Sequence, residues 1–93
     1  MRVVKVVKMV KMVKPEYPAH LKASGTEGTV LLEAVIGRDG HIVNIQPMNT
    51  QVHADLTKAA TDAVTLWQYE PTYLNGQPVE VVTAITVNFT LAP

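Results

Sequence analysis

Residues 54–71 constrain what this chain can fold into more than any other stretch of the sequence. Their apolar side chains recur at helical spacing, and charged and hydroxyl side chains occupy the opposite side, which indicates a surface helix. The predicted buried stripe consists of Leu56, Ala59, Ala60, Ala63, Val64, Leu66 and Trp67. Pro71 disfavours helix at the residue before it, so the helix is expected to end near Trp67 or Gln68. Such a helix is stable only on a second apolar layer, which the rest of the chain must supply.

Two apolar runs, residues 29–37 and 41–48, provide the first part of that layer. They flank Arg38-Asp39-Gly40, and a short loop with Asp-Gly between such runs predicts a β-hairpin with positive φ at the glycine. The residues expected to face the core from the first strand are Val30, Leu32, Ala34 and Ile36, and those from the second strand are Val43 and Ile45. Ile42 lies on the opposite side of the second strand, which leaves its parity open.

The C-terminal stretch Val79–Leu91 has the most regular alternation of apolar and polar residues in the sequence. At about 3.3 Å per residue it would extend roughly 40 Å, longer than most strands of small domains. It should therefore overhang its partners and leave backbone N–H and C=O groups to which another extended segment can add. The candidate partner-binding side chains on its wetter face are Glu80, Val82, Ala84, Thr86 and Asn88.

A short helix is predicted before the hairpin. Pro15-Glu16-Tyr17-Pro18 is a rigid entry to it, and Pro18 suits its first turn. Gly25 is placed to end this helix in the left-handed conformation, and Gly28 is expected to give a second bend. The predicted order of elements is therefore α-β-β-α-β with a long C-terminal strand.

A basic leader, residues 1–14, precedes the predicted domain, residues 15–93. The leader carries five basic residues and no acid, whereas the domain carries three basic and eight acidic residues. Basic residues recur at every third position, which fits neither a strand nor a helix, but the valine content favours an extended form and the lysines would protect an edge strand. A solvated, partly ordered segment is expected, and contact with anionic lipid or an acidic partner is the alternative.

Residues that carry enzyme chemistry do not form a recognisable set in this sequence. The three histidines are dispersed without metal-ligand spacing, and there is neither a nucleophile elbow nor a glycine-rich phosphate loop. The chain has no cysteine, and its five aromatic residues do not interleave with basic residues as in nucleic-acid-binding proteins. We therefore expect a binding module that is not an enzyme and that uses no cofactor, metal or nucleic acid.

Five blocks in fixed order resemble the C-terminal domain of TonB over about residues 13–91. The blocks are Pro15-x-Tyr17-Pro18, Gly25-x-x-Gly28-x-Val30, Asp39-Gly40, Ala59-Ala60-x-x-Ala63-Val64-x-x-Trp67-x-Tyr69-x-Pro71 and Asn75-Gly76-x-Pro78-Val79. The resemblance implies an α+β fold, in which a three-stranded antiparallel sheet carries two helices on one face in the order α-β-β-α-β.

The resemblance also implies a function. Such domains lie in the periplasm of Gram-negative bacteria and are tethered to the inner membrane by an anchor and spacer that this sequence lacks, which suggests a fragment. The anchor associates with ExbB–ExbD, and the domain binds the TonB box of outer-membrane transporters by β-strand addition, which supports active import. The matching positions are Lys14, Pro15, Glu16, Tyr17 and Pro18, together with the strand Val79–Leu91. The Val-Val-Lys repeats of residues 2–14 are not part of the family pattern.

Two other functions remain open at the level of sequence. The chain could be the C-terminal interaction domain of a membrane-bound metallopeptidase signal transducer. It could also be a self-assembly module that forms homodimers through the exposed strand. The sequence names neither the transporter nor the imported substrate.

Overall fold

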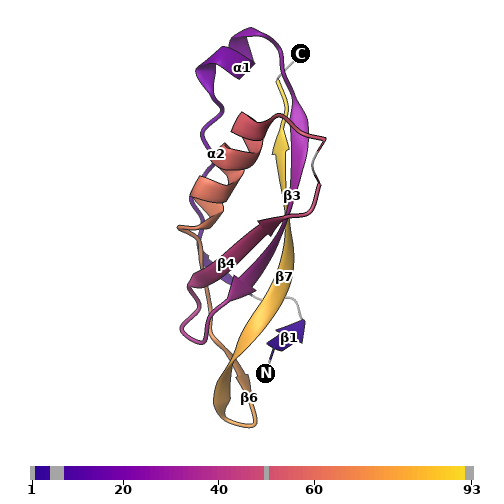
Figure 1. Cartoon of the computed structure of the whole chain (residues 1–93). Helices are drawn as coiled ribbons and strands as arrows, with labels where there is room; N and C mark the ends of the chain where they lie inside the picture. Colours follow the sequence, from indigo (N-terminus) through magenta and orange to yellow (C-terminus); the bar gives the residue numbers. More distant parts are fainter. Residues whose placement is uncertain (1, 5–7, 50, 92–93) are drawn as a thin grey trace.

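The computed structural model describes residues 2–4, 8–49 and 51–91. In chain order these residues form β1 (Arg2–Val4), β2 (Met9–Lys11), α1 (Ala19–Ala23), β3 (Gly28–Ile36), β4 (Ile42–Pro47), α2 (Ala54–Val64), β5 (Gln68–Tyr69), β6 (Thr72–Leu74) and β7 (Gln77–Phe89). The molecule is elongated, measuring 50 × 23 × 20 Å, and β7 runs along most of its length (Figure 1). Neither α1 nor α2 is long and apolar enough to cross a membrane.

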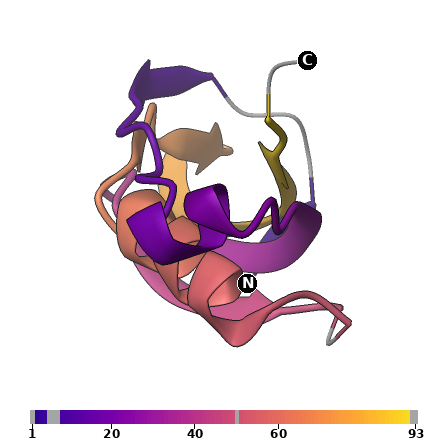
Figure 2. The same cartoon turned by 90° about the horizontal axis from the view of Figure 1, so that it is seen from above.

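The central layer is a sheet with the strand order β1-β7-β3-β4. β3 lies antiparallel to both of its neighbours, and the two helices lie next to each other over the strands (Figure 2). This arrangement confirms the predicted α+β class and the antiparallel core of three strands. The structure adds strands that we did not predict: β6 forms a hairpin with β7, β1 lies parallel to β7, and β2 pairs with β5 in a separate small sheet.

A β-bulge in β4 changes which side chains the β3–β4 hairpin buries. The pairing shifts by one residue at Ile36, which pairs with Ile42 and leaves Val43 as the extra residue. The expectation for Ile45 is confirmed, because Ile45 packs against the core together with Ile42. The expectation for Val43 is wrong: it is 58% exposed, because simple alternation does not survive an inserted residue.

The hairpin loop is held against the rest of the molecule at Gly40. Its φ is +89°, as predicted for the glycine of the Asp-Gly loop. Its C=O accepts a hydrogen bond of 2.9 Å from the backbone N–H of Tyr69, and a Cβ added at Gly40 would lie 2.0 Å from the carbonyl oxygen of Tyr69. Gly40 is therefore required both by the backbone conformation and by the close approach of β5.

α2 covers the sheet but is shorter than predicted. The ring of His53 accepts a hydrogen bond from the first-turn backbone, and the helix ends at Val64 rather than near Trp67. A tight turn follows, in which the N–H groups of Leu66 and Trp67 bond to carbonyl groups one turn back. This turn leaves Leu66 59% exposed, so its predicted burial is wrong, and it directs Trp67 into the core with 6% exposure.

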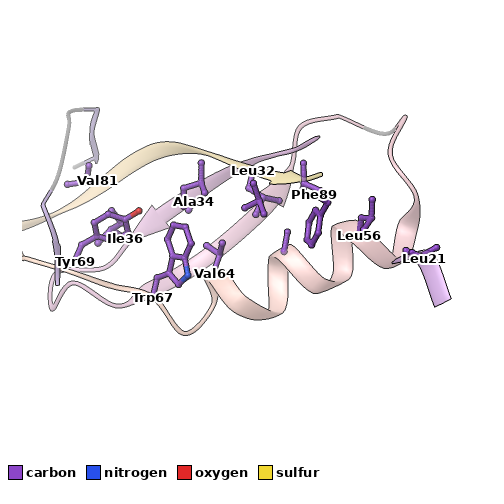
Figure 3. Packing of buried hydrophobic residues seen from close by; sticks show 14 residues of the cluster. Leu21, Leu32, Ala34, Ile36, Leu56, Val64, Trp67, Tyr69, Val81 and Phe89 are labelled. Carbon is purple, nitrogen blue, oxygen red and sulfur yellow. The ribbon is translucent and has the colours of Figure 1, made fainter. Parts of the chain in front are cut away.

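The hydrophobic core lies between α2 and the inner faces of β3 and β7 (Figure 3). Its buried members are Leu21, Val30, Leu32, Ala34, Ile36, Leu56, Ala60, Val64, Trp67, Tyr69, Val81, Ile85, Val87 and Phe89. All four inward residues predicted for β3 belong to this cluster, so the period-two pattern of that strand is confirmed.

β7 is shifted from its predicted bounds by two residues at each end. Asn75 and Gly76 both have positive φ, 53° and 79°, and form the two-residue turn that joins β6 to β7. Asn-Gly is the strongest short hairpin signal, so this pair indicates a strand before it, and that strand is β6. The buried side of β7 comprises Val79, Val81, Ile85, Val87 and Phe89, as alternation predicts.

α1 and the chain around it match the prediction except at Gly28. Pro18 precedes the helix and Gly25 has a φ of +72°, which confirms the left-handed end. Gly28 gives no bend: it is the first residue of β3 and pairs with Phe89. A Cβ there would lie 3.0 Å from the Cγ1 of Val52, so the glycine allows the Val52 side chain to pack closely against the start of β3.

The leader is attached to the body of the molecule at two places. β1 lies beside β7, and β2 pairs with β5. The C=O of Lys8 accepts a hydrogen bond of 2.9 Å from the N–H of Glu70, and the C=O of Val13 accepts one of 2.7 Å from the indole Nε1 of Trp67. The extended form predicted for the leader is confirmed in both strands, whereas a boundary at residue 14 stays a prediction.

Candidate functional site

The candidate site is the edge of β7 that faces away from β3. The hydrogen bonds made by β3 show which backbone N–H and C=O groups of β7 point toward this edge. Leu31, which lies opposite Thr86, donates its N–H to Oδ1 of Asn49 at 3.0 Å. Its C=O accepts from the N–H of Met48 at 2.8 Å. Both groups of Leu31 thus point away from β7, so Leu31 and Thr86 form a non-hydrogen-bonded pair. The N–H and C=O of Thr86 therefore point away from β3, toward the open edge.

Asn88 and Ala84 have the same orientation. The C=O of Thr29, opposite Asn88, accepts a hydrogen bond of 2.8 Å from Nδ2 of Asn49 and so also points away from β7. Backbone direction repeats at every second residue, and the pairing of β3 with β7 is regular, so Ala84 follows. Among the described strands, β1 pairs with this edge at residues 80–82, and none pairs with it over residues 83–89.

This open part of β7 lacks the features that protect edge strands in most proteins. Residues 83–89 read Thr-Ala-Ile-Thr-Val-Asn-Phe, with no charge and no proline, and their register with β3 has no bulge. The opposite edge of the sheet, β4, carries the bulge at Val43 and ends at Pro47. Of the two edges, β7 is the one suited to accept a further strand.

A groove of about 570 Å³ lies beside the end of this edge. Its lining residues are Lys14, Pro15, Glu16, Tyr17, Lys22, Val87, Asn88, Phe89, Thr90 and Leu91. The fold thus brings the segment that precedes α1 next to the C-terminal half of β7, although most of the sequence separates them. Four of the five residues predicted in that segment and Asn88 meet in one groove.

The other predicted residues lie elsewhere. Ala84 and Thr86 are exposed farther along the same edge, whereas Pro18 lines a different cleft beside α2. Glu80 and Val82 are half-buried and lie opposite β1, so their part of the edge is already paired. The five predicted positions on β7 lie on the same face of the sheet, but only Ala84, Thr86 and Asn88 lie along the part of the edge that β1 leaves open.

Tyr17 fixes one wall of the groove. Its ring meets the ring of Phe89 edge-on, with centroids 5.3 Å apart and planes at 81°, and its hydroxyl donates to the C=O of Thr26. Burial and the nearby Glu27 carboxylate raise the pKa of Tyr17, which favours the protonated phenol that this hydrogen bond needs. The contact couples the segment before α1 to the end of β7.

The sequence did not indicate two residues that shape the site. Asn49 bonds through its side-chain amide to Leu31 and Thr29, on the side of β3 that faces away from β7. Lys22 lines the groove, and its position one turn after Pro18 was the only sequence signal that could have placed it there. Asn49 carries no periodic signal, because it lies in the connection between β4 and α2.

A second cleft of about 470 Å³ lies between α2 and the chain before α1. His20 and Asp55 form an exposed pair across it, 2.8 Å apart, and Lys58 and Asp62 form another along α2 at 2.9 Å. The side-chain hydrogen bond from Lys58 to Asp62 raises the pKa of Lys58. No group of three metal-ligating side chains occurs in the part of the chain that the structure describes.

Comparison with known proteins identifies the family. The model for the Gram-negative bacterial TonB protein C-terminal region matches residues 13–91. This chain belongs to the TonB C-terminal domain family. The solution NMR structure of the Pseudomonas aeruginosa TonB C-terminal domain superposes with a TM-score of 0.79 at 26% identity, covering 94% of this chain and 88% of that one. The resemblance found in the sequence and the fold class it implied are both confirmed.

Curated relatives of this chain agree with this family assignment. Protein TonB of Xanthomonas campestris pv. campestris is 30% identical over 77 residues, which cover 83% of this chain and 34% of the relative. Protein TonB of Vibrio cholerae serotype O1 is also 30% identical over 77 residues, covering 83% of this chain and 32% of the relative. The chain therefore spans about a third of the length of the TonB proteins it matches.

Proposed function

We propose that this TonB C-terminal domain binds a short extended segment, the TonB box of an outer-membrane transporter, by adding it as a strand to the open edge of β7. The observation that carries the proposal is the direction of the backbone of Ala84, Thr86 and Asn88, whose N–H and C=O groups face an edge free of charge, proline and bulge.

Main-chain hydrogen bonds would supply most of the affinity, and side chains would adjust it. Ala84, Thr86 and Asn88 contribute small or polar exposed side chains along the edge. Lys14, Pro15, Glu16 and Tyr17 form the wall of the groove at one end, and Pro18 positions α1 behind them. An added strand would therefore enter a site with two sides, one of backbone and one of side chains.

The proposal extends to the whole protein of which this chain matches a part. That protein would be an energy transducer tethered to the inner membrane, with this domain in the periplasm. Its remaining part would associate with ExbB–ExbD, and its role would be to couple inner-membrane energy to import. Binding requires no catalytic group, so the domain would act as an adaptor and not as an enzyme.

A second copy of the chain is the other occupant that the edge favours. The same unprotected backbone can pair with an identical strand in a symmetric homodimer. Dimer formation and box binding would then compete for the edge.

Titration with synthetic N-terminal box peptides of candidate transporters tests the proposal, with backbone amides followed by NMR. We expect shifts at Ala84, Thr86 and Asn88 and along 14–17. Thr86→Pro removes an N–H that faces the open edge and leaves the bonds to β3 in place, so it should stay folded and lose at least about tenfold in affinity.

Val87→Pro is the matched control. Val87 alternates with Thr86, so its N–H bonds to β3 and its side chain is in the core. This variant should lose fold as well as binding, as circular dichroism would report. Shifts confined to the exposed face of α2, or a folded Thr86→Pro variant that binds normally, would contradict the proposal.

A further inference from the structure

β1 occupies the part of the β7 edge next to the proposed site. It runs parallel to β7, with Arg2 opposite Glu80 and Val4 opposite Val82 (Figure 1). Val82 and Ala84 are two residues apart on a regular strand, so their backbone groups face the same edge. β1 is therefore a strand that the chain has added to its own edge, and its last residue, Val4, lies two positions before the outward-facing Ala84 in register.

β1 is a small element, and the rest of the leader is held without it. Three residues pair with β7 through β1. The chain that follows is fixed independently by the pairing of β2 with β5, by the hydrogen bond between Lys8 and Glu70, and by the bond from Trp67 to Val13. β1 can therefore leave the edge while the leader keeps its other attachments to the body.

We propose that β1 is a built-in competitor for this edge, which limits the footprint of an added strand to Thr83–Phe89 and so selects partners by the length of their extended segment. The inference rests on the proposed function, because it concerns the partner that adds to β7. A segment that pairs only with Thr83–Phe89 does not meet β1. A longer segment that continues toward Glu80 must displace it.

The competitor works through its tether. A strand attached to the same chain is present at an effective concentration on the order of millimolar, so a pairing with a Kd near or below that concentration keeps the edge filled for about half of the time or more. A partner that needs the edge empty binds more weakly in proportion to the fraction of empty edge. If β1 is docked for about nine-tenths of the time, the apparent Kd of a long partner is about tenfold higher.

Peptides of different length distinguish this mechanism from a passive leader. The probes are a seven-residue box peptide that binds in the titration above, and the same peptide with four further residues at its N-terminus or at its C-terminus. Each is titrated into the full chain and into a chain that lacks residues 1–4. One extension should reach Glu80–Val82, depending on the direction in which the peptide pairs.

We expect the deletion to tighten binding of one extended peptide about tenfold, and to leave the seven-residue peptide within about twofold. Lys11→Gln is the control for charge, since it also removes one positive charge from the leader but keeps β1, and it should change neither affinity by more than about twofold. With the full chain, the extended peptide should also shift the amides of Arg2–Val4 at the concentration at which it shifts those of Ala84–Asn88.

Equal effects of the deletion on all three peptides, or no effect on any of them, would contradict the proposal that β1 is a competitor. Strand addition would still be supported in that case if the peptides shift the amides of Ala84–Asn88. Absence of peptide binding to either chain, with no shifts at Ala84–Asn88, would instead contradict strand addition and the competitor together.

Discussion

At the scale of single residues, three glycines have positive φ for different reasons. Gly25 and Gly76 have φ of 72° and 79°, and an added Cβ at either would meet nothing within 4 Å. Gly40 has φ of 89°, and an added Cβ would lie 2.0 Å from the carbonyl oxygen of Tyr69. Backbone conformation alone explains the first two, whereas Gly40 also lets β5 approach the hairpin loop.

Gly25→Ala and Gly40→Ala should separate these two causes. Gly25→Ala should cost about 1–2 kcal/mol, the penalty of a side chain in the left-handed conformation. Gly40→Ala should cost clearly more, because it also breaks the hydrogen bond to Tyr69, and Gly40→Val should be poorly tolerated. Urea unfolding of the two alanine variants checks the order, and equal losses would mean that the loop can move away from β5.

At the scale of elements, the turn after α2 decides which of two neighbouring apolar residues supports the fold. Leu66 and Trp67 were both predicted to be buried, but α2 ends at Val64 and the turn separates them. Trp67 reaches both the core and the leader, since its indole Nε1 donates to the C=O of Val13.

Trp67→Ala should cost about 3–5 kcal/mol, a large part of the stability of a small domain. Leu66→Ala, at the adjacent exposed position, should change stability by no more than about 0.5 kcal/mol. Trp67→Phe should lie between them, because it keeps an aromatic ring in the core and loses the bond to Val13. Thermal unfolding of the three variants provides the measurement, and a loss below about 1 kcal/mol for Trp67→Ala would disagree with the packing described above.

At the scale of the whole molecule, one sheet presents two unlike edges. β4 is protected by its bulge and by Pro47, whereas among the described strands the outer edge of β7 is covered by β1 at residues 80–82 and is open over residues 83–89. Residues 83–89 carry no charge, so the strand has no charged side chain of its own to protect this open part.

The open edge should also make the chain self-associate when no peptide is present. Sedimentation at increasing protein concentration should show a monomer–dimer equilibrium, and Thr86→Pro should shift it toward the monomer because it removes a donor from the edge. A box peptide in excess should do the same. Dimers that persist in the folded Thr86→Pro variant would place the self-association surface elsewhere.

The sequence by itself determined the elements whose residues interact locally. The alternation in β3 and β7, the amphipathic α2, the Asp-Gly loop and the left-handed Gly25 depend on neighbours in the chain, so their patterns were readable. The five blocks that resemble the family extended this to the fold class and to strand addition as an expectation.

Only the tertiary structure decided the rest, because it depends on pairing between distant residues. The bulge at Val43 reflects the register between two strands, and the meeting of Lys14–Tyr17 with Asn88 reflects the packing of Tyr17 on Phe89. The backbone groups of Ala84, Thr86 and Asn88 point to the open edge because the other edge of β7 is paired with β3. Alternation in the sequence indicates the face on which a side chain lies, but not the edge to which a backbone group points. The place of β1 on that edge is likewise a long-range pairing that no local pattern in the leader specifies.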